Sequence, residues 1–254
     1  MQIIISPAKK MKEDIDSFAC RDLPALLPRT RVLLRHLRGL DVPSLRKLLS
    51  CNDQIAELNY ARFQTMDLER DLTPALLAYE GIQYRYMAPA VFTSDALEYV
   101  QEHLRILSGF YGVLRPFDGV RPYRLEMQAK LSVDGYGDLY GFWGGRLGEA
   151  LGAETDTVVD LASKEYSRAV LPHLPRGTRV VTCVFGEVRE GRVVEKGTLC
   201  KMARGEMVRY MAQRRVKRLE ELTAFSALGY RFDPGRSGPD LFIFLREGKK
   251  EAAK

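Results

Sequence analysis

The amino-acid sequence predicts a mixed α/β protein of the α+β kind, in which helices surround a mixed sheet. Runs typical of buried strands lie near the beginning, the middle and the end of the chain, at residues 2–5, 157–161 and 240–245. Helical segments separate them at irregular intervals, so the regular strand–helix alternation of a doubly wound fold is missing. No repeat, low-complexity block or Ser/Gly linker divides the 254 residues. A single domain over 1–254 is therefore expected, with a frayed, charged tail over 245–254.

One buried strand followed mainly by helices is expected in the first hundred residues. The strand over 2–5 ends at Pro7. Apolar residues recur at helical spacing in three stretches, and Pro74 opens a short fourth helix; these helices are expected over 29–40, 42–50, 52–64 and 75–79. A further helix, capped by Thr93, is expected to end at Gly109, because glycine tolerates the left-handed backbone that often ends a helix.

Two helices and one hairpin are the main elements expected in the second half. The helix over 139–151 contains four glycines, which weaken a helix and so indicate close packing against another element. The turn Glu190-Gly191 lies between two apolar runs and is the clearest hairpin signal in the chain. The helix with the clearest apolar periodicity covers 198–216.

Composition and charge are those of an ordinary soluble protein. The 39 Lys and Arg exceed the 33 Asp and Glu by six, which is too small an excess to indicate a partner unless the cations gather in one place. The start lacks the features of a signal peptide, and no apolar run approaches the ~20 residues of a membrane helix. A cytoplasmic location without membrane contact is therefore expected. The four cysteines form no Cys-x-x-Cys pair, which indicates reduced and mostly buried thiols.

The sequence contains no pattern that predicts a metal or cofactor. Its three histidines, His36, His103 and His173, form no His-x-x-His or Glu-x-x-His pair. Neither a Gly-x-x-x-x-Gly-Lys-Ser/Thr loop nor a Gly-x-Gly-x-x-Gly dinucleotide motif occurs. We therefore expect no metal and no cofactor, and a monomer is favoured.

The stretch over 107–127 is unusually rich in glycines, aromatic residues and arginines. Gly109 and Gly112 flank aromatic residues and would let the backbone approach a neighbouring helix or a phosphate. Prolines fix the local backbone, so the guanidinium groups that follow are expected to be held in place. These groups belong to Arg115, Arg121 and Arg124.

Two further groups of cations are candidates for a binding surface. Lys9 and Lys10 follow the first strand, at the edge of the sheet where α/β folds usually place ligands. Lys201 and Arg204 project from one flank of the helix over 198–216. Charged runs are usually solvated faces, but this helix lacks acidic partners at i,i+4, and arginine forks suit phosphate oxygens. Gly205 interrupts the helix where a close backbone approach would be useful.

Four blocks of the sequence resemble the YaaA family, the bacterial peroxide-stress proteins long catalogued as a domain of unknown function. The longest block is LSGFYGVLRPFDGVRPYRLEM over 107–127, and the others are ISPAK over 5–9, LASKEY over 161–166 and KMARG over 201–205. The resemblance spans essentially the whole chain. It implies a family-specific fold, a role in peroxide stress and DNA binding through a positively charged cleft. One departure is Asp160, where relatives commonly carry Asn.

The resemblance also implies a helix–hairpin–helix motif. In that motif, a glycine-containing hairpin after a helix presents backbone N–H groups to a phosphate without reading sequence. Here 104–108 would supply the first helix and 109–112 the hairpin. The glycine pair is one residue further apart than usual, and no second helix is obvious before Pro116.

The predicted function is DNA binding in the peroxide-stress response, through phosphate contacts on duplex or branched DNA and with little sequence preference. Gly109 and Gly112 would let backbone amides reach a phosphate, and Tyr111 would stack on an exposed base. One basic cleft would be lined by seven cations: Lys9, Lys10, Arg115, Arg121, Arg124, Lys201 and Arg204.

Two alternatives stay open at this point. One is a regulatory protein whose basic face meets an acidic protein partner. The other is an enzyme that acts on a nucleotide or a damaged base, with Glu165 as general base. Its polar pocket would contain Ser6, Lys9, Arg124, Ser163, Glu165, Tyr166 and Lys201. The purely local interpretation of Ser163 and Glu165 is a helix cap followed by a first-turn acid. A deep enclosed pocket would favour the enzyme, and a shallow basic groove would favour plain DNA binding.

Overall fold

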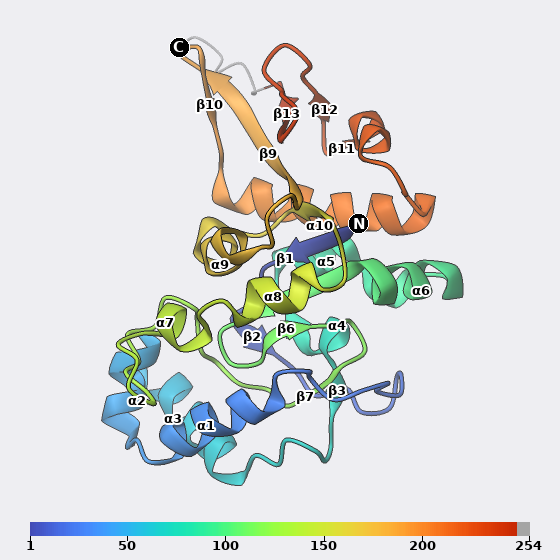
Figure 1. Cartoon of the computed structure of the whole chain (residues 1–254). Helices are drawn as coiled ribbons and strands as arrows, with labels where there is room; N and C mark the ends of the chain where they lie inside the picture. The colour runs from blue at the N-terminus through green and yellow to red at the C-terminus, as the bar shows by residue number, and fades with distance from the viewer. Residues whose placement is uncertain (248–254) are drawn as a thin grey trace, which may run out of the picture.

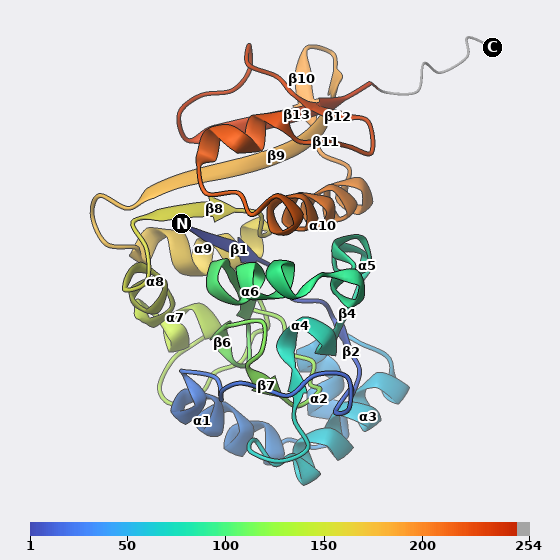
Figure 2. The ribbon, with the colours of Figure 1, turned by 90° about the vertical axis from the view of Figure 1, so that its right-hand side faces the viewer.

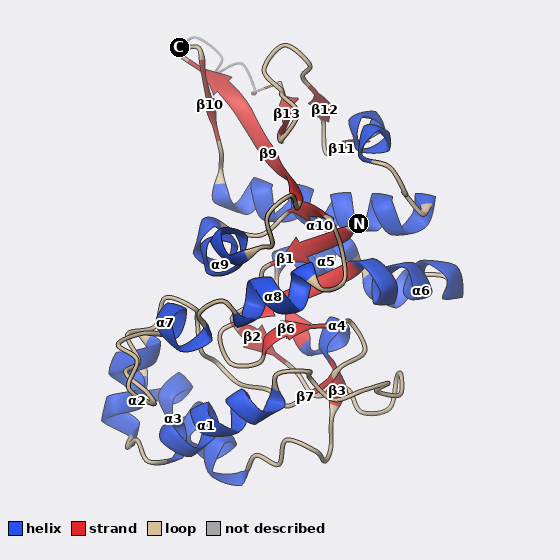
Figure 3. Ribbon diagram, viewed as in Figure 1, coloured by secondary structure: helices blue, strands red, loops and turns tan. Residues whose placement is uncertain are grey.

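A nine-stranded mixed sheet forms the centre of the molecule, which confirms the predicted α/β class (Figures 1 and 3). The computed structural model describes residues 1–247. The strand order is β11-β12-β13-β9-β8-β1-β5-β6, and β10 pairs with the outer half of β9. The strands are β1 (Gln2–Ile5), β5 (Leu104–Ser108), β6 (Gly112–Leu114), β8 (Thr157–Asp160), β9 (Arg179–Arg189), β10 (Arg192–Val194), β11 (Ser226–Ala227), β12 (Tyr230–Phe232) and β13 (Leu241–Arg246).

Parallel pairing in the middle of the sheet brings distant segments to one edge. β1 pairs in parallel with both β5 and β8, and β9 pairs in parallel with β8 and β13. Ile3, Ile4 and Ile5 are fully buried, as expected for a strand covered on both faces. Because Ile4 lies opposite Asp160, the segments after β1 and β8 leave the sheet at the same carboxyl edge.

Helices cover both faces of this sheet and build a separate layer at one end, where α1, α2 and α3 gather (Figures 1 and 2). The α-helices are α1 (Leu27–Arg38), α2 (Val42–Leu49), α3 (Asp53–Thr65), α4 (Ala75–Ala78), α5 (Ile82–Met87), α6 (Ser94–His103), α7 (Leu139–Trp143), α8 (Arg146–Gly152), α9 (Lys164–Val170) and α10 (Gly197–Arg214). Two short ribbons pair β2 (Lys10–Met11) with β4 (Tyr79–Glu80) and β3 (Thr73–Pro74) with β7 (Gly119–Val120). Three 3-10 turns complete the elements: η1 (Pro89–Val91), η2 (Leu171–His173) and η3 (Leu219–Ala224).

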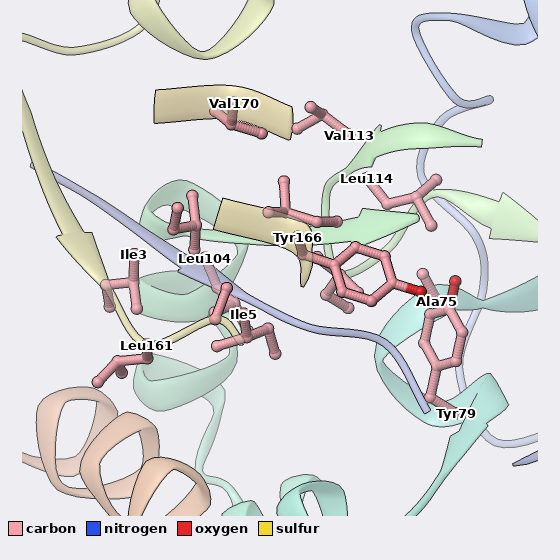
Figure 4. Packing of buried hydrophobic residues seen from close by; sticks show 14 of the residues in the cluster. Ile3, Ile5, Ala75, Tyr79, Leu104, Val113, Leu114, Leu161, Tyr166 and Val170 are labelled. Atoms are coloured by element: carbon pink, nitrogen blue, oxygen red, sulfur yellow. The ribbon is translucent and has the colours of Figure 1, made fainter. Parts of the chain in front are cut away.

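The buried side chains around β1 join the sheet to its helices (Figure 4). Ile3 and Ile5 from β1 and Leu104 from β5 belong to the same apolar cluster as Tyr166 and Val170 from α9. All five are at most 5% exposed. This packing holds the start of α9 against the end of β1, where the candidate site lies.

The predicted helix up to Gly109 is wrong in its last turns. Thr93 caps α6 as predicted, accepting a hydrogen bond from the Ala96 N–H at 3.3 Å, but the helix ends at His103. Residues 104–108 form β5, which runs beside β1 and turns back into β6 as an antiparallel β-hairpin. The segment pairs with a neighbouring strand and is completely buried, so tertiary context overrides its helical pattern. A helix–hairpin–helix element is therefore not formed by 104–112.

In the second half the predicted hairpin, the helix over 198–216 and the last strand are present, whereas β11 and β12 were not predicted. The hairpin of β9 and β10 turns at Glu190-Gly191, both in the left-handed region. The helix predicted over 139–151 is broken into α7 and α8 at Gly144, whose φ is +50°. The last strand, β13, includes residues 245 and 246 of the predicted tail, and residues 248–254 lie outside the described residues. Within residues 1–247, every helix is too short or too polar to cross a membrane.

Candidate functional site

A cavity of about 300 Å³ opens at the carboxyl edge of β1 and β8. We call it the central cavity. Four chain segments and one helix meet there: residues 6–10, 80–84, 123–126, then Ser163, Glu165 and Tyr166, and from α10 Lys201 and Arg204. Its volume lies at the lower end of the range of roughly 300–1,000 Å³ typical of small-molecule sites.

Two serines form the floor of the cavity where the parallel strands end. The Ser163 backbone N–H donates to Ser6 Oγ at 2.8 Å, and the Ser6 hydroxyl donates to Ser163 Oγ at 3.1 Å. Ser163 occupies the N-cap position of α9, but its side chain makes no capping hydrogen bond. The pairing of Ser6 and Ser163 is thus a direct result of the parallel register of β1 and β8.

Two carboxylates in the cavity have different surroundings. Glu126 pairs with Lys9 at 2.5 Å and with Arg124 at 3.4 Å, so two cations balance its charge. Glu165 lies half-buried in the first turn of α9 and accepts a hydrogen bond from the Gln128 N–H at 3.2 Å. Burial raises the pKa of Glu165 above its ordinary value, and the negative charge of Glu126 adds to this. A carboxylate with a raised pKa is a stronger base than an ordinary one.

The opposite wall is built by α10 and α5, which pack closely together (Figure 2). Gly205 permits this contact, because a Cβ there would overlap the Gln83 carbonyl oxygen and lie 2.9 Å from Met87 N. The close approach places Lys201 and Arg204 of α10 beside α5. Lys201 is exposed at the cavity, and Arg204 is largely buried and pairs with Glu195 at 3.5 Å.

Several residues of the cavity were not among the predicted site residues. The short helix α5 was not predicted, and it supplies Gln83 and Tyr84. Tyr84 donates a hydrogen bond to the Ser6 carbonyl oxygen at 3.1 Å and so joins α5 to the end of β1. Tyr123 and Glu126 lie within the 107–127 block, where the prediction concentrated on arginines and glycines. Arg124 and Glu126 are two residues apart, the spacing that places side chains on one face of an extended segment, and this was the signal that could have identified Glu126.

Five of the seven predicted cleft cations line the central cavity: Lys9, Lys10, Arg124, Lys201 and Arg204. Arg115 and Arg121 do not, so the single cleft of seven cations is wrong. Arg115 pairs with Glu154 at 2.8 Å beside a second cavity of about 240 Å³. Arg121 pairs with Glu13 at 3.2 Å and with Asp71 at 3.7 Å. Nearby carboxylates thus pair with both guanidinium groups.

The predicted roles of Gly109, Tyr111 and Gly112 in DNA contact are also wrong, because all three are buried. A Cβ at Gly109 would lie 2.6 Å from the Leu125 carbonyl oxygen, so this glycine lets the 125–126 wall of the cavity approach β5. A Cβ at Gly112, whose φ is +84°, would lie 2.8 Å from Leu26 Cδ1 and 3.1 Å from Trp143 Cζ3. The Tyr111 hydroxyl accepts a hydrogen bond from the Arg121 N–H at 2.9 Å. These residues shape the site from behind and do not line it.

Asp160 lies behind the floor of the cavity and is buried. It accepts hydrogen bonds from the Ala162 N–H at 2.9 Å and from the Ser167 hydroxyl at 2.8 Å. Burial raises the pKa of this carboxyl group, while the nearby charge of Arg204 acts in the opposite direction. Among residues 1–247, no three His, Cys, Asp or Glu side chains are arranged to hold a metal ion.

Asp118 at the second cavity leads to a prediction about stability. Burial raises its pKa from 3.8 to about 6, although Asp118 Oδ2 accepts a hydrogen bond from the Arg115 N–H at 2.8 Å. The folded protein therefore binds a proton more tightly than the unfolded chain, and this stabilisation is lost as the pH rises through about 6. Asp118→Asn removes the titration and keeps an oxygen acceptor. Urea unfolding from pH 4.5 to 8 should show wild type losing about 2 kcal/mol relative to the variant. Parallel pH profiles would contradict this prediction.

Fold and site together define a class: a mixed α/β protein with a cation-lined polar cavity at the carboxyl edge of its parallel strands. Comparison with known proteins is more specific. The sequence model of the family described as "Peroxide stress protein YaaA" matches residues 1–236, and the chain belongs to this family. The resemblance stated from the sequence is thereby confirmed, and the family links the chain to peroxide stress.

Curated relatives support the same assignment over the whole length. A UPF0246 protein of Desulfitobacterium hafniense (strain Y51) is 53% identical over 246 residues, which cover 97% of this chain and 98% of the relative. A UPF0246 protein of Pediococcus pentosaceus is 50% identical over 246 residues, with the same two coverages. A UPF0246 protein of Lachnoclostridium phytofermentans is 49% identical over 246 residues, covering 97% of this chain and 96% of the relative. These names specify no activity.

Proposed function

We propose that this chain acts in the peroxide-stress response by binding one nucleotide in the central cavity, and that Glu165 transfers a proton to or from it. The nucleotide is either free or part of a DNA strand, since both present the same phosphate and base. The observation that carries the proposal is the convergence of five cations with a half-buried carboxyl group of raised pKa around one cavity of about 300 Å³.

The charge of the cavity favours an anionic ligand. Its five cations outnumber its three carboxylates, which belong to Glu80, Glu126 and Glu165, so the lining carries a formal charge of 5 − 3 = +2. Lys10 and Lys201 are exposed, and neither forms an ion pair with any residue in 1–247. Lysine ammonium groups at the rim of a cavity are suited to phosphate oxygens.

The aromatic side chains favour a ligand that also has a flat, apolar part. Tyr84, Tyr123 and Tyr166 line the cavity and are at most 5% exposed, so their rings form rigid walls. A nucleobase packs favourably against aromatic rings whatever its sequence. A nucleotide fits both parts of the cavity. Its phosphate would lie at the lysines of the rim, and its base would lie among the tyrosine rings.

Glu165 is the group best placed for chemistry on such a ligand. Its raised pKa lets it accept a proton from bound water or from the nucleotide, and return it later. Lys9 is also close enough to lower the pKa of Glu165, so the ion pair between Lys9 and Glu126 influences the proton affinity of the site. The Ser6–Ser163 pair offers hydroxyl groups that can orient a reacting oxygen.

DNA binding without chemistry is the second candidate. Lys10 and Lys201 favour it, because exposed cations at the rim of the cavity can contact a phosphate backbone that never enters. This form of DNA binding uses fewer phosphate contacts than the predicted seven-cation cleft would have made. Little sequence preference is expected, since phosphate contacts carry no base information.

Lys201→Ala tests the cation-lined cavity, and Arg121→Ala is the matched control. Loss of a phosphate contact should weaken binding of a nucleoside monophosphate about tenfold. For a single-stranded oligonucleotide, the same variant should lower the log–log salt slope by about 1. Arg121 lies away from the cavity and is paired with two carboxylates, so its replacement should change neither quantity. Calorimetry and fluorescence titration across salt measure both.

The two ligands separate the two candidates. Binding of the free nucleotide supports nucleotide binding inside the central cavity. Binding of the oligonucleotide alone supports DNA binding at the rim of the cavity. Equal losses in the Lys201 and Arg121 variants, or no binding of either ligand by the wild-type protein, would overturn the proposal.

A further inference from the structure

The side-chain amide of Gln83 is buried at the central cavity without a hydrogen-bond partner. Gln83 lies on α5, lines the cavity and is 7% exposed. Its Nε2 atom is inaccessible to solvent and has no hydrogen-bond partner among residues 1–247. Buried polar groups in native proteins are nearly always paired, so this amide requires an explanation.

The fold holds Gln83 firmly in this position. Its backbone carbonyl oxygen lies against Gly205, and α5 packs along α10 at this point. The next residue, Tyr84, is tied by its hydroxyl to the backbone of Ser6. These contacts hold α5 against α10 and the end of β1, so the Gln83 side chain stays at the wall of the cavity.

Two other unpaired donors belong to the same cavity. The Nε atoms of Arg124 and Arg204 are also buried without a hydrogen bond. The residues in 1–247 that line the cavity show no corresponding buried acceptor. The unmet groups are thus donors, and a ligand that satisfies them must bring acceptor oxygens or nitrogens.

We propose that Gln83 recognises the base of the bound nucleotide, and that this base carries a carbonyl group next to a ring N–H. This inference rests on the proposed nucleotide function and names its substrate class, a keto base. The Gln83 amide donates from Nε2 to the carbonyl oxygen and accepts from the ring N–H at Oε1, a two-bond pairing of amide with amide. The phosphate is left to the lysines, because a charged group favours their ammonium ions over a neutral amide.

Inosine 5′-monophosphate and adenosine 5′-monophosphate form a matched pair of probes. They share the sugar, the phosphate and the purine ring, and differ in that inosine has a carbonyl and a ring N–H where adenosine has an amino group and a bare ring nitrogen. The wild-type protein should bind the inosine nucleotide at least tenfold more tightly, because the adenosine edge opposes its amino group to the unpaired donors. Equal affinities would overturn the assignment of a keto base.

Gln83→Met is the matched protein variant, because methionine has similar length and fills the site without an amide. It should lose the preference for the inosine nucleotide and keep the affinity for ribose 5-phosphate, which has no base. Its melting temperature should equal or exceed that of the wild-type protein, since an unpaired buried amide has been removed. If this variant does not fold, Gln83→Leu provides the same comparison, because leucine is uncharged and lacks the amide donor.

Calorimetry with the three ligands on the full chain separates the two proposals. If the wild-type protein binds no nucleotide, the proposed function fails. If the wild-type protein and the Gln83→Met variant bind the inosine nucleotide equally well, the role of Gln83 fails while the nucleotide site stands. A parallel loss for ribose 5-phosphate would show a structural effect on the cavity and would also overturn base recognition by Gln83.

Discussion

Gly205→Ala is expected to destabilise the protein by about 3 kcal/mol and to abolish ligand binding in the central cavity. The added Cβ would overlap the Gln83 carbonyl oxygen and lie 3.0 Å from Tyr86 Cβ. The first of these contacts is with backbone, so no side-chain rotation relieves it and α5 must move away from α10. Because both helices line the cavity, the same displacement separates Lys201 from Gln83. Urea denaturation measures the stability, and calorimetry measures the binding.

Gly197→Ala is the control, because it makes the same substitution in the same helix. A Cβ at Gly197 would meet no atom within 4 Å, and the residue is exposed at the start of α10. Alanine favours the helix, so this variant should be neutral or more stable by up to about 1 kcal/mol. If both variants behaved alike, the contact of α5 with α10 at Gly205 would have no energetic importance.

Glu154→Ala is expected to cost about 3 kcal/mol of stability, because it leaves a buried charge without its partner. The Arg105 side chain is 5% exposed and donates to Glu154 Oε2 from Nε at 2.8 Å. Burial lowers the pKa of Arg105, which shows that its positive charge is penalised in this position. Glu154 also pairs with Arg115, so two guanidinium groups lose their counter-charge at once. Thermal or urea unfolding at low salt measures the loss.

An exposed ion pair and a double variant are the controls. Arg21 and Glu98 pair at the surface with side chains 42% and 55% exposed, so Glu98→Ala should cost much less stability than Glu154→Ala. Adding Arg105→Met to Glu154→Ala should restore part of the stability, because the unpaired charge is removed with its partner. Equal costs for Glu98→Ala and Glu154→Ala would mean that burial of Arg105 has little effect on this pair.

Local patterns were sufficient where a single segment determines its own conformation. The apolar runs at β1, β8 and β13 are strands, Thr93 caps its helix, and Glu190-Gly191 turns the β9–β10 hairpin. Local patterns gave the wrong structure where pairing with a distant strand determines the conformation. Residues 104–108 satisfy a helical period as well as a strand, and only the neighbouring β1 makes the strand more stable.

Some features of the candidate site could likewise be predicted from local sequence, and others could not. The residues placed after β1 and β8 meet because parallel strands share a carboxyl edge, which the positions of Ser6 and Ser163 in the sequence already implied. The sequence did not indicate which carboxylates pair with Arg115 and Arg121. Arg115 finds Glu154 thirty-nine residues away and Arg121 finds Asp71 fifty residues away, and such ion pairs depend on the folded path of the chain.

The sequence by itself determined the α/β class, the family, and the types of residue that gather at the sheet edge, because these depend on periodicity and motif. Only the tertiary structure decided which cations share a cavity, which glycines serve internal packing, and that Gln83 is buried without a partner. The physical reason is that burial and pairing are properties of segments brought together from distant parts of the chain. Residue type and spacing describe each segment alone.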